Sequence, residues 1–260
     1  MTEKNIENGA SGTALVTAAG RRIGKAIALD LGRQGYNVAV HFHTSASEAN
    51  AVAAEIRGMG VKSTVFKADL GNTDAVLDLV PRAAKALGAI TCLVNNASIF
   101  EPDDVATITP ASWDAHLDIN LRAPTLLARA FADQLPGGIQ GNIVNLIDER
   151  VLRPNPQFMS YFASKFGLWG LTQTMAQGFG AKIRVNGIGP GPTLKNSRQT
   201  EAQFAKVQSR LLLGYGPTLE DITRTLRFIL QTPALTGQMI ALDSGQHLAW
   251  QTPDLERSDG

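Results

Sequence analysis

The fold of this chain is decided by one stretch near its start, which reads Ala14-Leu15-Val16-Thr17-Ala18-Ala19-Gly20-Arg21-Arg22-Ile23-Gly24. An apolar run, a turn with glycines and then Ile23, Ile27 and Leu31 on one stripe predict a strand, a tight turn and a helix. The N–H groups and the positive end of such a helix can bind a pyrophosphate. Gly20 permits close approach of the backbone, and Gly24 lets the helix pack tightly on the sheet. We therefore expect a dinucleotide site at this turn.

The same alternation of strand and helix continues along the chain. Strands are expected at residues 14–16, 37–41, 64–66, 92–94, 142–146, 183–186 and 238–241. Helices are expected at residues 47–59 (with Ser47 as the N-cap), 73–87, 113–135 and 159–179, with a further helical excursion before the last strand. This order predicts a single-domain, Rossmann-type, doubly wound parallel sheet of seven strands with helices on both faces. Such a sheet binds its ligand beyond the carboxyl ends of the strands.

The remaining organisation is simple. Residues 1–11 and 251–260 are polar and lack apolar periodicity, so we expect flexible tails around one domain at 12–250. Within that domain, residues from about 194 to 213 are expected to form a lid over the substrate.

Composition excludes several classes of protein. With 44% hydrophobic and 18% charged residues the chain can bury a core and is not a disordered one. Lys and Arg total 24 against 23 for Asp and Glu, so no basic excess points to nucleic acid. No apolar run reaches the 18 residues of a membrane span. A polar, acidic start and a single cysteine, Cys92, favour the reducing cytoplasm.

The second strand indicates which nicotinamide dinucleotide is bound. NAD-binding proteins place an acid about 20 residues after the glycine turn, where it holds the ribose hydroxyls. Residues 41–45 read His-Phe-His-Thr-Ser, and the first acid is Glu48, inside the next helix. His43, Thr44 and Ser45 can donate hydrogen bonds to a 2′-phosphate, with Arg22 in reach. We predict NADPH (NADP) as the cofactor, the alternative being that the two histidines are ordinary strand-end residues.

A candidate catalytic set follows the fourth and fifth strands. Tyr161 and Lys165 stand four residues apart on one face of a helix, where the ammonium would lower the pKa of the phenol. Asp148 lies just past a strand end. Pro124 cannot donate a hydrogen bond to the carbonyl of Asn120, which could then hold a water leading to Lys165. The alternative for Asn120 is a satisfied core amide.

Together these motifs resemble the short-chain dehydrogenase/reductase family over nearly the whole chain. The resemblance is carried by the glycine turn, Asp69, the stretch Asn95-Asn96-Ala97-Ser98, Asn120, Tyr161 with Lys165, and Gly189-Pro190-Gly191. It implies a nicotinamide dinucleotide, a homotetramer, Tyr161 as proton donor and Lys165 on the nicotinamide ribose. It also implies Asp69 near the adenine, Asn96 and Ala97 near the adenine ribose, and Thr193 near the nicotinamide or pyrophosphate. The full set expected to bind the cofactor is Gly20, Arg22, Ile23, Gly24, His43, Thr44, Ser45, Asp69, Leu70, Asn96, Ala97, Ser98, Tyr161, Lys165, Pro190, Gly191 and Thr193.

Three positions depart from the usual family pattern. Ala18 replaces the first glycine of the turn, which is harmless if its φ stays negative, and Arg22 replaces the middle one. Asp148 stands where the family places a catalytic serine, thirteen residues before the tyrosine. A carboxylate there would repel a tyrosinate and keep Tyr161 protonated.

These departures resemble one branch, the pteridine reductases and bacterial dihydromonapterin reductases. The likeness covers residues 20–24, 41–45 and 95–98, together with Phe100, Asp148, Tyr161 and Lys165. It implies an NADPH-dependent reductase of a pterin or dihydropterin, with hydride transfer to a ring C=N bond. Phe100 would stack on the pterin, Ser98 and Arg22 would bond its polar edge, and Tyr161 with Asp148 would deliver the proton. Thr44, which is Arg in some members of the branch, weakens the grip on the 2′-phosphate.

Two other functions stay open at this point. One is a general carbonyl reductase of ketones or 3-oxoacyl compounds, against which Asp148 in the serine position argues. The other is a non-catalytic NADP-binding sensor, which would not need the Tyr161–Lys165 pair. In every case the expected partner is a small molecule, with no nucleic acid, no membrane and no metal.

Overall fold

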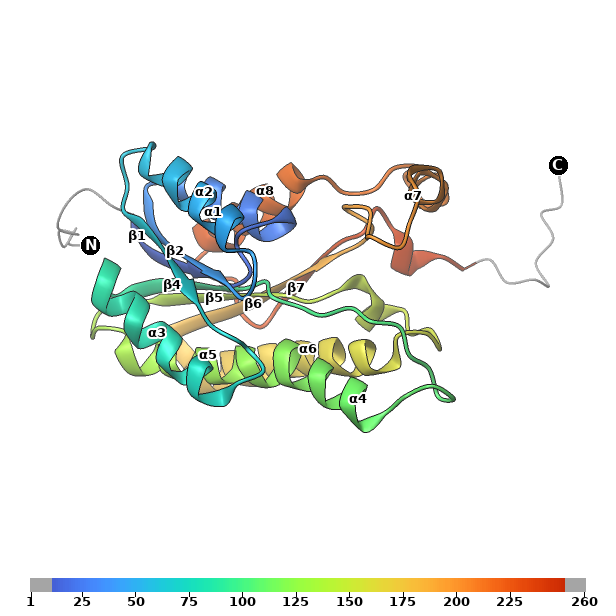
Figure 1. Ribbon diagram of the computed structural model, residues 1–260, viewed down its shortest axis with the longest axis horizontal. Helices are drawn as coiled ribbons and strands as arrows, with labels where there is room; N and C mark the ends of the chain where they lie inside the picture. Colours follow the sequence, from blue (N-terminus) through green and yellow to red (C-terminus); the bar gives the residue numbers. More distant parts are fainter. Residues whose placement is uncertain (1–10, 251–260) are drawn as a thin grey trace, which may run out of the picture.

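Seven parallel strands lie at the centre of the protein, whose computed structural model describes residues 11–250 (Figure 1). The strands are β1 (Gly12–Val16), β2 (Tyr36–Phe42), β3 (Ser63–Lys67), β4 (Ile90–Asn95), β5 (Gly141–Leu146), β6 (Ile183–Pro190) and β7 (Met239–Leu242). Their order across the sheet is β3-β2-β1-β4-β5-β6-β7. The predicted seven-stranded parallel sheet is confirmed.

Helices cover both faces of this sheet (Figure 1). One face carries α1 (Arg22–Arg33), α2 (Ala46–Arg57) and α8 (Leu219–Gln231). The other face carries α3 (Thr73–Leu87), α4 (Pro110–Leu117), α5 (Ala123–Gln134) and α6 (Met159–Phe179). The short helix α7 (Glu201–Gln208) stands apart from both layers, within the expected lid segment.

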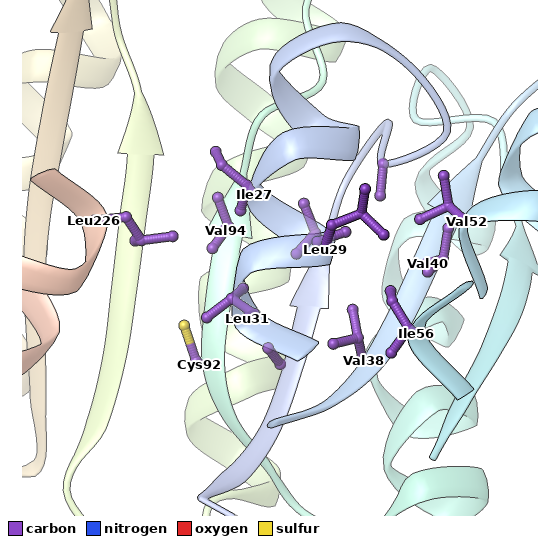
Figure 2. Close-up of a cluster of buried hydrophobic side chains, with 14 of the residues drawn as sticks. Ile27, Leu29, Leu31, Val38, Val40, Val52, Ile56, Cys92, Val94 and Leu226 are labelled. Atoms are coloured by element: carbon purple, nitrogen blue, oxygen red, sulfur yellow. The ribbon is translucent and has the colours of Figure 1, made fainter. Parts of the chain in front are cut away.

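Alternation along the strands produces two separate cores. Because successive side chains of a strand point to opposite faces, Val38 and Val40 pack under α1 and α2 while Ala39 faces α3. Figure 2 shows the first core, in which side chains of α1, α2 and α8 meet those of β2 and β4. Cys92 is buried in it, and this burial raises the pKa of its thiol to about 12, so the thiol is inert at neutral pH.

The strand order reverses direction between β1 and β4, which leaves a crevice at their carboxyl ends. Thr17 joins the two strands there, because its backbone N–H donates to the carbonyl of Val94 at 3.0 Å. Its hydroxyl oxygen accepts from the backbone N–H groups of Asn96 at 2.8 Å and Ala97 at 2.9 Å. The crevice is therefore closed at its base and open above, where a ligand can enter.

Two predicted helices differ in detail. The helix expected from Ser47 begins at Ala46, and its N-cap is Ser45. The helix expected at 113–135 begins at Pro110, where the Thr109 side chain accepts from the N–H of Ser112, and it is interrupted by a π-helical turn at Asp118–Arg122. Such a turn often marks a functional position, and this one contains Asn120.

The ends of the domain are partly defined. Ser11, which the sequence places in the N-terminal tail, donates its backbone N–H to Gly35 O at 3.0 Å and its hydroxyl to Gln34 O at 2.8 Å. The rest of that tail and residues 251–260 lie outside the described residues. No helix between residues 11 and 250 is long and apolar enough to cross a bilayer.

Two leucines of α3 test the assignment of the core. Leu79 is fully buried and Leu77, on the same helix, is 42% exposed. Leu79→Ala should lower the free energy of unfolding by about 2–5 kcal/mol, since it leaves a cavity in a packed core. Leu77→Ala should lower it by less than about 0.5 kcal/mol. Urea unfolding of both variants measures the difference, and equal losses would contradict the packing described.

Candidate active site

A cavity of about 510 Å³ opens at the carboxyl ends of the central strands. Eleven of the residues expected to bind cofactor or substrate line it: Arg22, Ile23, Asn96, Ser98, Phe100, Asp148, Tyr161, Lys165, Pro190, Gly191 and Thr193. Gly20, Gly24, His43, Thr44, Ser45, Asp69, Leu70, Ala97 and Asn120 are not part of this lining. Apart from Asn120, the residues of the second group follow β1, β2, β3 and β4, as an extended dinucleotide would require.

Tyr161 and Asp148 form the shortest side-chain contact in the cavity. The Tyr161 hydroxyl donates to Asp148 Oδ2 at 2.6 Å, and the backbone N–H of Arg150 donates to Asp148 Oδ1 at 2.9 Å. Both oxygens of Asp148 thus act as acceptors, as an ionised carboxylate does. Burial raises the pKa of Tyr161 well above its usual value, and the charge of Asp148 raises this pKa further. The lowering of this pKa expected from Lys165 is therefore wrong, whereas the expected retention of the proton through Asp148 agrees with the geometry.

Lys165 lies one helical turn beyond Tyr161 and is also buried. Its Nζ donates to the carbonyl oxygen of Leu146 at 2.7 Å. Burial lowers the pKa of Lys165 to about 8, and the Asp148 charge opposes this lowering. Burial raises the pKa of Asp148, and the hydrogen bonds from Tyr161 and Arg150 oppose this rise. At neutral pH the ammonium therefore balances part of the negative charge beside Tyr161.

Asn120 lies behind the cavity rather than in its wall. Its Oδ1 accepts from the N–H of Ile99 at 2.9 Å, and its Nδ2 donates to Ile99 O and to Ser164 Oγ, both at 3.0 Å. These bonds join the loop after β4 to α6, next to Tyr161 and Lys165. The side chain is a fully satisfied core amide, the alternative that the sequence left open.

Phe100 belongs to an aromatic cluster that the sequence did not reveal. Its ring stacks on Phe158 with centroids 4.2 Å apart and planes 10° apart, and the edge of Tyr161 meets it at 4.6 Å. Phe158 is not among the residues that line the cavity. Its φ of +59° is unusual for a non-glycine residue, and its N–H donates to the carbonyl of Asp103 at 2.7 Å.

The glycine turn corrects two expectations. Ala18 has a φ of +50° and Arg22 a φ of +52°, so the negative φ that would make Ala18 a harmless replacement for glycine is not present. A Cβ on Gly24 would clash with Ala18 O and with Asn96 Nδ2, so this glycine packs against the turn and the loop after β4 rather than against the sheet. The N-cap Arg21 makes no side-chain capping bond. The first N–H groups of α1 are thus left for an anion, which fits a pyrophosphate.

The loop after β2 offers the donors that a 2′-phosphate needs. Ser45 is the N-cap of α2 but makes no side-chain capping bond, so its hydroxyl is not used by the helix. His43 and Thr44 are exposed beside it. His43 Nε2 lies 3.9 Å from a carboxylate oxygen of Asp69, in the loop after β3. These residues fit the phosphorylated end of NADPH.

The two arginines of the turn are engaged within the chain. Arg21 forms an exposed ion pair with Glu48. Arg22 donates to the carbonyls of Lys195 at 2.8 Å and Leu194 at 3.1 Å, at the start of the lid segment. From the lid, Arg198 donates to the carbonyl of Phe100 at 2.7 Å. The lid is therefore tied to both sides of the cavity.

Glu149 is one of the cavity residues that the sequence did not predict, although its position beside Asp148 was a signal. It is 4% exposed, and its Oε2 has no hydrogen-bond partner among residues 11–250. Burial and the neighbouring Asp148 raise the pKa of Glu149 to about 7. No group of three or more metal-ligating side chains occurs in the described part of the chain.

Comparisons with known proteins agree with this geometry. The profile of the short chain dehydrogenase family matches residues 12–206. The chain is 31% identical to the 3-oxoacyl-(acyl-carrier-protein) reductase FabG of Staphylococcus epidermidis, over 91% of this chain and 99% of that protein. Its structure resembles FolM alternative dihydrofolate reductase 1 of Brucella canis, complexed with NADP, with a TM-score of 0.92, 45% identity and coverage of 95% and 98%. A short chain dehydrogenase of Burkholderia cenocepacia in complex with NADP gives a TM-score of 0.86, 32% identity and coverage of 94% and 100%.

The buried carboxyl of Glu149 predicts a pH-dependent loss of stability. Its pKa is about 7 in the folded chain against an ordinary 4.5, so the folded state loses stability as the pH rises through this window. Glu149→Gln should therefore stabilise the protein relative to wild type by up to about 3 kcal/mol more at pH 8 than at pH 4.5. Urea unfolding at both pH values measures this, with Glu55→Gln on the exposed face of α2 as control. A Glu149→Gln effect that is the same at both pH values would contradict the assignment.

Proposed function

We propose that this protein, which belongs to the short-chain dehydrogenase family, is an NADPH-dependent reductase of a pterin or dihydropterin. The observation that carries the proposal is the 2.6 Å hydrogen bond from the Tyr161 hydroxyl to Asp148, within a cavity whose wall includes Phe100. The 45% identity to FolM proteins, whose structures contain NADP, supports both the substrate class and the cofactor.

The residues in the loops that follow β1, β2, β3 and β4 are suited to hold the cofactor. The N–H groups at the start of α1 would receive the pyrophosphate, and His43 and Ser45 the 2′-phosphate. As the family resemblance implies, Asp69 would contact the adenine and Lys165 would hold the nicotinamide ribose. When bound, NADPH supplies the hydride for reduction of a ring C=N bond.

Proton delivery falls to Tyr161. Adding a hydride to the carbon of a C=N bond leaves the electron pair on nitrogen, and this strongly basic atom takes a proton even from a weak acid. Burial and Asp148 keep Tyr161 in its protonated form until that moment. The nearby Lys165 ammonium then stabilises the tyrosinate that remains. The product has gained one hydride and one proton.

A 3-oxoacyl or ketone reductase is the second candidate, and the FabG relatives favour it. Such a reaction needs a neutral hydrogen-bond donor on the carbonyl oxygen, beside the tyrosine. The serine position holds Asp148, whose oxygens both accept hydrogen bonds here. A carboxylate would repel the oxyanion that forms from a ketone, so the site supports the pterin better.

We also propose the homotetramer that the family resemblance implies, and the cytoplasm as its compartment. Aromatic side chains exposed on three different helices support an interface between copies of the chain: Trp113 on α4, Phe166 on α6 and Phe228 on α8. The single buried thiol of Cys92 is compatible with a reducing compartment.

Removal of the Tyr161 hydroxyl tests the proton donor. Tyr161→Phe deletes one oxygen and no ring volume, so kcat for dihydropterin should fall by about 100- to 10,000-fold. The Kd for NADPH, measured by calorimetry, should stay within about twofold of wild type. Activity above a tenth of wild type would assign the proton to another group.

Asp148 and Phe100 distinguish the two substrate classes. Asp148→Ser should lower turnover of dihydropterins and preserve or raise that of simple ketones. Phe100→Ala should raise KM for pterins by several-fold to about tenfold, because an aromatic pair contributes about 0.5–1.5 kcal/mol beyond its buried area. Its effect on aliphatic ketones should be small. NADPH oxidation with a panel of dihydropterins, dihydrofolate and ketones measures all of these, and full dihydropterin activity in Asp148→Ser would favour the ketone reductase.

A further inference from the structure

His41, near the end of β2, connects two loops that the proposed cofactor would touch. Its imidazole is 2% exposed. Nδ1 accepts a hydrogen bond from the backbone N–H of Ala18 at 3.0 Å, so Nε2 carries the proton and donates to the carbonyl of Ala68 at 3.1 Å. One neutral tautomer therefore satisfies both bonds. His41 does not line the cavity.

The bond to Ala18 supports a strained residue. The φ of +50° at Ala18 is in the left-handed region, which a side chain disfavours and a glycine adopts freely. The family that the chain belongs to normally has glycine here. Two hydrogen bonds hold Ala18 in this conformation: its N–H binds His41, and its carbonyl accepts from Asn96 Nδ2 at 3.3 Å. The bond to His41 thus helps to hold the turn in a conformation that glycine would adopt without strain.

The other bond reaches the adenine end of the site. Ala68 immediately precedes Asp69, and its own N–H donates to the carbonyl of Phe42 at 3.1 Å. The imidazole and this backbone bond together fix the start of the loop after β3. A single side chain therefore sets the spacing between the pyrophosphate turn at Ala18 and the loop of Asp69.

We propose that His41 is a positioning residue for NADPH, which acts by holding Ala18 and Ala68 in the conformations that receive the two ends of the dinucleotide. This inference rests on the proposed use of NADPH, and it is independent of the substrate. Burial, with smaller contributions from nearby His43 and Arg82, lowers the pKa of His41 to about 4 although the hydrogen bond to Ala68 opposes this, so the imidazole is neutral at physiological pH. Neutrality is required because a protonated Nδ1 could not accept from Ala18.

Binding of NADPH to the full-length protein tests the proposal without any substrate. His41→Phe keeps an aromatic ring but removes both bonds, and it should raise the Kd for NADPH about tenfold or more, since Ala18 loses the hydrogen bond that holds it in its strained conformation. At saturating NADPH, kcat should stay within about twofold of wild type. His41→Asn retains an acceptor near the position of Nδ1 and should recover part of the affinity. Calorimetry measures Kd, and steady-state kinetics with the best dihydropterin of the panel measures kcat.

Ala18→Gly supplies the sharpest test. In the His41→Phe background it removes the strain that His41 offsets, so NADPH should again bind several-fold more tightly. A merely structural role for His41 predicts no such rescue.

Ser63→Ala is the matched control for lost stability. The Ser63 hydroxyl is buried and donates to Val38 O at 2.8 Å, at the other end of the β2–β3 pair. This variant should lower Tm but leave the Kd for NADPH unchanged.

The possible results separate the two proposals. An unchanged Kd in His41→Phe, an equal loss in Ser63→Ala, or no rescue by Ala18→Gly would each overturn the role of His41. If His41→Phe fails to fold, the Kd for NADPH of His41→Asn is compared with that of Ser63→Ala. A Kd raised only in His41→Asn supports the role of His41, and equal Kd values in the two variants overturn it. Tight NADPH binding by wild type without turnover of any pterin would instead overturn the proposed function and leave the role of His41 standing. Wild type that does not bind NADPH would overturn both.

Discussion

The hydroxyl of Thr17 holds together the place where the sheet reverses its strand order. It accepts from two successive N–H groups, those of Asn96 and Ala97, while its own backbone binds Val94. Beyond this point the chain after β1 leads to α1 on one face of the sheet and the chain after β4 leads to α4 on the other face, so a crevice remains. Everything proposed to touch the dinucleotide is arranged around that crevice, at the carboxyl ends of the strands. A change at Thr17 would therefore alter the geometry of the turn and of the loop after β4 together.

Above this base, burial rather than charge alone sets the chemistry of the cavity. Tyr161 and Lys165 are both nearly inaccessible to water, so the pKa of the phenol rises and that of the ammonium falls. Asp148 raises both of these pKa values through its negative charge. As a result the Tyr161 phenol keeps its proton, and the pKa of the Lys165 ammonium lies close to neutral pH, at about 8. In the proposed reaction, proton transfer from Tyr161 would be favoured only when a strongly basic atom forms beside it, as the nitrogen of a reduced C=N bond would be.

Strain is concentrated around the same cavity. Four non-glycine residues in the described chain have positive φ, and all follow strands on this side of the sheet: Ala18, Arg22, Phe158 and Ser244. Each such residue costs on the order of 1–3 kcal/mol and persists only where neighbours over-determine it. His41 supports Ala18, and Asp103 supports Phe158 through its carbonyl. Hydrogen bonds from residues outside the cavity lining, such as His41 and Asp103, thus hold the backbone around the cavity in strained conformations.

The sequence by itself determined the sheet, its seven strands and the edge where the site forms. Alternation of apolar runs is a local property, and the carboxyl ends of parallel strands must share an edge, so the pattern alone places Tyr161, Lys165 and Asp148 together. It did not determine the positive φ of Ala18, the stacking of Phe158 on Phe100, the absence of Asn120 from the cavity lining or the burial of the Glu149 carboxyl. These features depend on which atoms of distant segments come within bonding distance, as His41 does with Ala18 and Ala68. Only the tertiary structure decided them, because burial and hydrogen bonding between segments override the preferences of each residue alone.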